Sequence, residues 1–134
     1  MRPINLKHLI IAKQSLPDSL CGAITSNWGV CPKPAEYTSL SSFIGKLKEL
    51  DSPFDDHLFQ LLDDCYFGFK IPQISKEFDC LWIGENEIIN IELKSGFKPE
   101  EDIKKQLRQN RCYLGSLKKT VQSFTYVSST HTCY

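Results

Sequence analysis

Apolar and polar side chains alternate along residues 87–94, and this period-two pattern predicts a β-strand. Its apolar face carries Ile89, Ile91 and Leu93, and its polar face carries Asn90, Glu92 and Lys94. Residues 77–83 predict the preceding strand, joined to this one by a tight connection that begins at Gly84. Within that strand the same period places Asp79, Leu81 and Ile83 on one face, and Phe78, Cys80 and Trp82 on the other.

The remaining pattern predicts three helices and two more strands. Apolar residues at helical spacing predict a helix from about residue 40 to residue 50, and a second over residues 53–64. Residues 65–74 predict the first strand, Pro99 opens a helix with an acidic first turn, and residues 120–130 predict the last strand. The first three strands are close enough for hairpins, whereas a helix leads to the fourth and allows parallel pairing. The predicted class is therefore α/β: a mixed β-sheet flanked by helices, in the order helix, three strands, helix, strand.

The length of 134 residues fits a single domain. Residues 53–134 are predicted to form its core, and the turn-rich residues 1–52 an N-terminal extension that packs on that core. No apolar run is long enough to cross a membrane, and the first residues lack the apolar centre of a signal peptide. A cytoplasmic location with no membrane partner is therefore expected. The six cysteines show no Cys-x-x-Cys pair, which favours reduced thiols over disulfides or zinc ligation.

The formal net charge is zero, which argues weakly against strong nonspecific binding of nucleic acid. The charge is unevenly distributed, however. Basic residues outnumber acidic ones over residues 95–119, and acidic residues are in excess over residues 1–94. This asymmetry suits a polyanion bound beside an acidic site, although charge alone favours the simpler explanation of a solvated helix face.

Asp79, Glu92 and Lys94 are the candidate catalytic residues. Two carboxylates from neighbouring strands can bind a hard divalent cation, and a lysine beside them can polarise a phosphate or orient a water molecule. The simpler alternative is a solvated aspartate at a strand end and a weak surface pair of Glu92 with Lys94. The Glu-x-Lys spacing gains specificity from the aspartate on the preceding strand and the helix that follows.

That following helix carries candidate substrate contacts. Gln106 and Tyr113 lie about two turns apart, and Gln109 lies one turn before Tyr113. Gln106 can hydrogen-bond a metal ligand or a phosphate, and Tyr113 can contact a substrate backbone. Arg108 and Arg111 are candidate phosphate contacts. Each of these residues also fits an ordinary solvated helix surface.

In these motifs the chain resembles the PD-(D/E)xK nuclease superfamily, whose core is that of the restriction endonucleases. Asp79 matches the central metal-binding aspartate, Glu92-Leu93-Lys94 matches the (D/E)xK motif, and Gln106, or Gln109 with Tyr113, matches the glutamine motif. The resemblance is closest to nuclease domains attached to helicases or found in DNA repair and defence. Many members also carry a glutamate on the first core helix. The helix predicted over residues 53–64 has none, so Asp56, or else Asp55, is the candidate further metal ligand.

The resemblance implies a deoxyribonuclease that uses Mg²⁺ or Mn²⁺, held by Asp79 and Glu92 with help from Asp56. DNA is the expected partner, with RNA as an alternative substrate, and a homodimer or attachment to a helicase-type domain is compatible with the family. A second hypothesis is a nuclease-like domain that binds nucleic acid or protein without cutting. The missing glutamate and the zero net charge motivate this second hypothesis.

Overall fold

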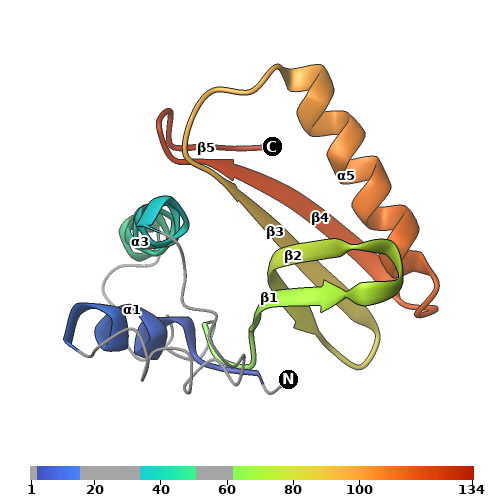
Figure 1. Ribbon diagram of the computed structural model, residues 1–134, viewed down its shortest axis with the longest axis horizontal. Helices are drawn as coiled ribbons and strands as arrows, with labels where there is room; N and C mark the ends of the chain where they lie inside the picture. The colour runs from blue at the N-terminus through green and yellow to red at the C-terminus, as the bar shows by residue number, and fades with distance from the viewer. Residues whose placement is uncertain (1–2, 16–33, 51–61) are drawn as a thin grey trace.

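The computed structural model describes residues 3–15, 34–50 and 62–134, and Figure 1 shows their arrangement. The helices are α1 (Leu6–Ser15), α3 (Pro34–Leu50) and α5 (Glu100–Gly115). The strands are β1 (Tyr66–Ile71), β2 (Lys76–Ile83), β3 (Glu87–Lys94), β4 (Thr120–Val127) and β5 (Thr132–Cys133). A short 3₁₀ helix, η1 (Pro72–Ile74), joins β1 to β2.

The strands form one five-stranded mixed sheet in the order β1-β2-β3-β4-β5. The pairs β1–β2 and β2–β3 are antiparallel, β3–β4 is parallel, and β5 returns antiparallel to β4. Parallel pairing of β3 with β4 is possible because α5, which connects them, returns the chain to the end of the sheet at which β3 begins. The predicted α/β class with a mixed sheet is thereby confirmed.

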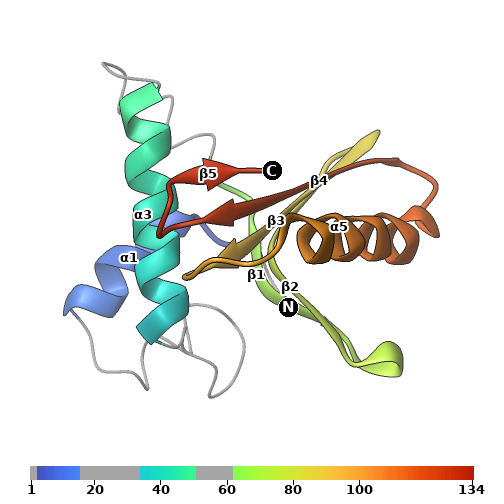
Figure 2. The ribbon, with the colours of Figure 1, turned by 90° about the horizontal axis from the view of Figure 1, so that it is seen from above.

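Helices cover both faces of the sheet, with α5 on one face and α1 and α3 on the other (Figures 1 and 2). Beneath α5 lies a small core cluster of Phe78, Leu81, Ile88 and Leu114. The larger cluster on the opposite face joins Leu6, Leu9, Leu40 and Phe43 of the two N-terminal helices to sheet residues such as Leu93 and Tyr126. The described parts of residues 1–52 therefore supply much of the main hydrophobic core. The predicted boundary between residues 52 and 53 lies outside the described residues.

Several predicted boundaries were wrong. The helix predicted from residue 40 begins at Pro34, where proline suits the first helical turn and Glu36 favours the helix dipole. Helix α1 was not predicted at all, because its apolar residues do not form a clear stripe. The strand predicted over residues 65–74 ends at Ile71, because the following proline cannot donate to the ladder. The helix predicted over residues 53–64 lies largely outside the described residues, and Leu62 to Asp64 form a turn.

The strand predicted over residues 120–130 also differs from the structure. It ends at Val127, and a turn containing His131, whose φ is 51°, leads into β5. The described cysteines are free; Cys65 and Cys80 are buried, whereas Cys112 and Cys133 are exposed.

A bend in the β1–β2 hairpin decides how β2 presents its side chains. The register runs from Phe67↔Cys80 to Phe69↔Phe78 without a pair between Gly68 and Asp79. Gly68 has a φ of 67°, a conformation that glycine adopts without strain. Across this bend the alternation of faces is interrupted, and Phe78 packs with Leu81 instead of with Cys80. The prediction that Phe78 shares a face with Cys80 and Trp82 was therefore wrong.

Candidate active site

Asp79 is fixed to the neighbouring strand by its own side chain. The paired register of β2 with β3 ends at Cys80↔Ile91, one residue before Asp79 and Glu92 would face each other. Beyond that point the Asp79 carboxylate replaces a backbone partner, because its Oδ2 accepts a hydrogen bond of 2.8 Å from the Leu93 N–H. The hairpin bend and this bond together hold Asp79 beside the Glu92-Leu93-Lys94 segment.

Glu92 is a buried carboxylate with only 3% of its surface exposed. Asn110 of α5 donates to its Oε1 at 3.1 Å, and Gln106 of α5 donates to its Oε2 at 3.3 Å. Lys76, the first residue of β2, adds an ammonium 3.4 Å from Oε1. Burial of a carboxylate is costly unless it is hydrogen-bonded and paired, and these donors satisfy both conditions. The alternative of a solvent-facing Glu92 on a surface strand is therefore wrong.

Asn110 and Lys76 were not singled out from the sequence. Asn110 is fully buried on α5, between the core positions Ile103 and Leu114. Asn110 could have been recognised as a polar residue within the apolar stripe of the helix, because such a residue needs a buried hydrogen-bond partner. Lys76 lies 16 residues before Glu92, and only the strand pairing brings the two together.

Asp79 is strongly perturbed by its surroundings. The pKa of Asp79 is raised from 3.8 to about 7, mainly by burial and secondly by the negative charge of Glu92. The Leu93 N–H and the Lys94 ammonium act in the opposite direction, and Glu36 contributes a smaller upward effect. Two other carboxylates therefore act on Asp79, and a perturbed carboxyl of this kind is typical of functional sites.

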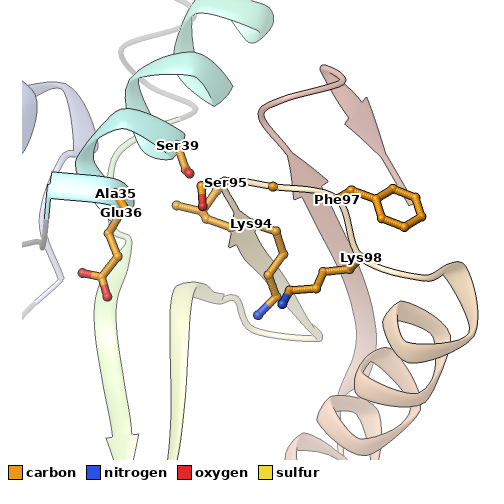
Figure 3. Close-up of a pocket in the computed structure, with 9 residues that line it drawn as sticks. Ala35, Glu36, Ser39, Lys94, Ser95, Phe97 and Lys98 are labelled. Atoms are coloured by element: carbon orange, nitrogen blue, oxygen red, sulfur yellow. The ribbon is translucent and has the colours of Figure 1, made fainter.

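A cleft of about 300 Å³ opens beside this group, between the start of α3 and the end of β3. It is lined by Ala35, Glu36, Ser39, Leu93, Lys94, Ser95, Gly96, Phe97 and Lys98. Lys94 and Lys98 both line the cleft, and in the view of Figure 3 their side chains extend in the same direction. The Glu36 carboxylate lies across the gap from them, and the Phe97 ring is turned away. The cleft thus has one cationic wall and one anionic residue opposite it.

Glu36 is an acidic residue beside the cleft that was not singled out from the sequence, whereas Asp56 and Asp55 were the candidates for a further metal ligand. Both aspartates lie outside the described residues, so their placement stays a prediction. The helix that packs against β3 is α3, and Glu36 in its first turn lines the same cleft as Lys94. Glu36 could have been found from the sequence as an acidic residue two positions after Pro34, a proline suited to a first helical turn. It was missed because the apolar pattern of this helix becomes clear only at Leu40.

The other predicted substrate contacts are less central. Gln106 donates a hydrogen bond to Glu92, and its predicted role toward a metal ligand or phosphate stays a prediction. Arg108, Gln109, Arg111 and Tyr113 are exposed on α5 and do not line the cleft. Their assignment as nucleic-acid contacts stays a prediction.

The donors fit a hard divalent cation in their chemistry. Asp79, Glu92 and the Leu93 carbonyl carry oxygen atoms, the ligand type that Mg²⁺ and Mn²⁺ prefer. The pKa of Asp79 is raised to about 7 first by burial and then by repulsion from Glu92, and a bound cation would offset both effects by favouring the charged carboxylate. Among the described residues, however, no three acidic, histidine or cysteine side chains are gathered as a preformed metal site. Glu36, Asp79 and Glu92 therefore do not form a ready-made three-carboxylate cage.

Comparison of the chain with protein-family models, with curated protein sequences and with solved structures finds no match. Within residues 3–15, 34–50 and 62–134, no helix has both the length and the apolar character needed to span a bilayer.

Proposed function

We propose that this protein is a divalent-metal-dependent nuclease that hydrolyses phosphodiester bonds in DNA. The observation that carries the proposal is the grouping of Asp79, Glu92 and Lys94 at one end of the β2–β3 pair, beside a cleft with a cationic wall. The order of elements in the resembling nuclease family, one helix, three strands, a helix and a strand, agrees with α3 to β4. This agreement supports the proposal, although fold alone does not define a reaction.

Each residue has a defined part in the proposed reaction. The carboxylates of Asp79 and Glu92, with the Leu93 carbonyl, are the groups that would hold the metal. When bound, Mg²⁺ or Mn²⁺ supplies positive charge that polarises the phosphate and makes a water molecule more acidic. Gln106 and Asn110 hold Glu92 in one orientation by bonding both of its oxygens.

Lys94 acts on the reacting phosphate. Its ammonium orients the attacking water and stabilises the negative charge that develops as the water oxygen bonds to phosphorus and the bond to the leaving oxygen breaks. Lys98 lies on the same side of the cleft and binds an adjacent phosphate as a point charge. Phe97, with 77% of its surface exposed, offers a face on which an unpaired base can stack.

The proposal is tested with labelled single- and double-stranded DNA in Mn²⁺. Glu92→Gln and Lys94→Gln are each expected to lower the cleavage rate by about 100-fold or more. Glu87→Gln is the matched control for the first variant, because Glu87 is exposed at the start of the same strand. Lys118→Gln, at an exposed position after α5, is the control for the second. Cleavage that persists in the Glu92 and Lys94 variants would refute this mechanism.

A second candidate function is a nuclease-like module that binds nucleic acid without cutting it. The observation that favours it is the engagement of Glu92 by three protein donors, one of them the ammonium of Lys76. Addition of Mn²⁺ separates the two candidates, since a ligand that binds the native state raises the unfolding temperature. A rise abolished by Asp79→Asn supports the nuclease, whereas DNA binding with no response to Mn²⁺ supports the module. The same cleavage assay on RNA of matched sequence decides the substrate class.

A further inference from the structure

We propose that Lys76 is a built-in counter-ion of Glu92 that competes with the divalent cation and so sets the metal concentration at which the site is loaded. This inference rests on the proposed function, because it concerns the same carboxylates. It adds a residue that lies outside the motifs of the sequence and assigns it a role in setting the affinity for the metal.

The geometry places the Lys76 ammonium between two attractive groups. Its Nζ lies 3.4 Å from Glu92 Oε1 and 5.0 Å from the centre of the Phe78 ring, within the range of a cation–π contact. The Lys76 side chain is 18% exposed and the Glu92 side chain 4%. The pair is thus largely removed from water. Water screens such a buried pair only weakly, so the attraction between the two charges is strong.

Lys76 is the only charged donor among the described groups that hydrogen-bond to Glu92. Asn110 and Gln106 are neutral amides, and they leave the charge of the carboxylate in place. A carboxylate offers about four acceptor positions, so the two amides and one ammonium leave little room for a further ligand. A divalent ion that bonds to Glu92 therefore meets a positive charge already on Oε1, and the ammonium must withdraw.

The position of Lys76 allows such a withdrawal. It is the first residue of β2 and follows Ser75, which has a φ of 51°, so it stands at a turn and not inside a long ladder. Its four-carbon stem can carry the ammonium along the Phe78 ring to solvent while the backbone stays paired with Ile71. The two amides, fixed on α5, do not need to move.

A purely structural ion pair makes a different prediction. If Lys76 serves only to neutralise a buried carboxylate, its loss lowers stability equally with and without metal. If it competes with the metal, its loss lowers stability without metal, tightens metal binding, and costs less stability once the metal is bound.

The experiment measures the Kd for Mn²⁺ by calorimetry, and the unfolding temperature at zero and saturating Mn²⁺, for the full chain. Lys76→Gln is expected to bind Mn²⁺ about tenfold more tightly than the unchanged protein. Lys70→Gln is the matched control, because it removes the same charge from an exposed pair with Glu77 on the adjacent strand. Lys76→Arg keeps the charge and is expected to bind Mn²⁺ no more tightly than the unchanged protein.

The outcomes separate this inference from the proposed function. Tighter binding by Lys76→Gln alone supports the inference, and so does binding by Lys76→Gln when the unchanged protein binds none, although that result argues against the nuclease. Equal or weaker binding by Lys76→Gln, or tighter binding by Lys76→Arg, overturns the inference and leaves the nuclease intact. Absence of Mn²⁺ binding in every variant overturns both.

Discussion

Replacement of Asp79 by asparagine should stabilise this protein at alkaline pH while removing its proposed activity. Asparagine has nearly the same shape as aspartate, and its side-chain oxygen can still accept the hydrogen bond from the Leu93 N–H. It carries no charge, however, so it avoids both the cost of burying a carboxylate and the repulsion from Glu92. Active sites commonly give up stability in this way to keep a reactive arrangement.

The magnitude follows from the pKa of Asp79. A pKa raised from 3.8 to about 7 means that the native state holds the proton more tightly than the unfolded chain does. The stability that this proton contributes is fully present below the unfolded pKa near 4, and it is lost as the pH rises through about 7. Because each pKa unit corresponds to about 1.4 kcal/mol, the total loss is about 4 kcal/mol, of which about 2–3 kcal/mol falls between pH 5 and pH 8.

The assay is urea unfolding followed by tryptophan fluorescence at pH 5, 6, 7 and 8, with a chelator present to exclude metal. The free-energy difference between Asp79→Asn and the unchanged protein should widen by about 2–3 kcal/mol from pH 5 to pH 8. Asp64→Asn is a suitable control, since Asp64 is exposed and has a φ of 54°, a conformation that asparagine tolerates. Its effect should stay within about 0.5 kcal/mol at every pH. A difference for Asp79→Asn that does not change with pH would refute the account of a buried, repelled carboxylate.

Three further predictions concern residues around the cleft. Glu36→Gln should lower the pKa of Asp79, by less than Glu92→Gln does, and the measured result should be a pH-dependent loss of stability that is smaller and occurs at lower pH. Phe97→Ala should weaken binding of single-stranded DNA by about 1–3 kcal/mol in a fluorescence-anisotropy titration, with an unchanged unfolding temperature, because the ring is exposed; equal affinity would exclude stacking. Asn110→Leu should destabilise the fold by about 1–3 kcal/mol in urea unfolding, because it leaves Glu92 Oε1 with one donor fewer; a stability equal to that of the unchanged protein would show that this bond is dispensable.

Short-range pattern was enough to place the central motif. The alternation along β3 put Glu92 and Lys94 on one face, and the tight connection after Ile83 brought Asp79 to the neighbouring strand. These features depend only on the strand period and on the length of a turn. Both can be read within a few residues.

Other parts of the candidate site could not be read in this way. Glu36 reaches the cleft because α3 packs against β3, and Lys76 reaches Glu92 because β2 pairs with β3. Phe78 lies on the opposite sheet face from the one predicted, because the hairpin bends at Gly68. A glycine permits such a bend but does not by itself require it. The weak apolar pattern at the start of α3 gave no reason to extend that helix back to Glu36.

The sequence by itself determined the class of fold, the succession of the first four strands along the chain, and the placement of a glutamate and a lysine on one strand face. Only the tertiary structure decided which charges surround that glutamate, how deeply it is buried, and why the neighbouring aspartate titrates near pH 7. The physical reason is one of range. Side-chain direction follows from local backbone geometry, whereas burial and electrostatic energy depend on every group that packing brings close, whatever its distance along the chain.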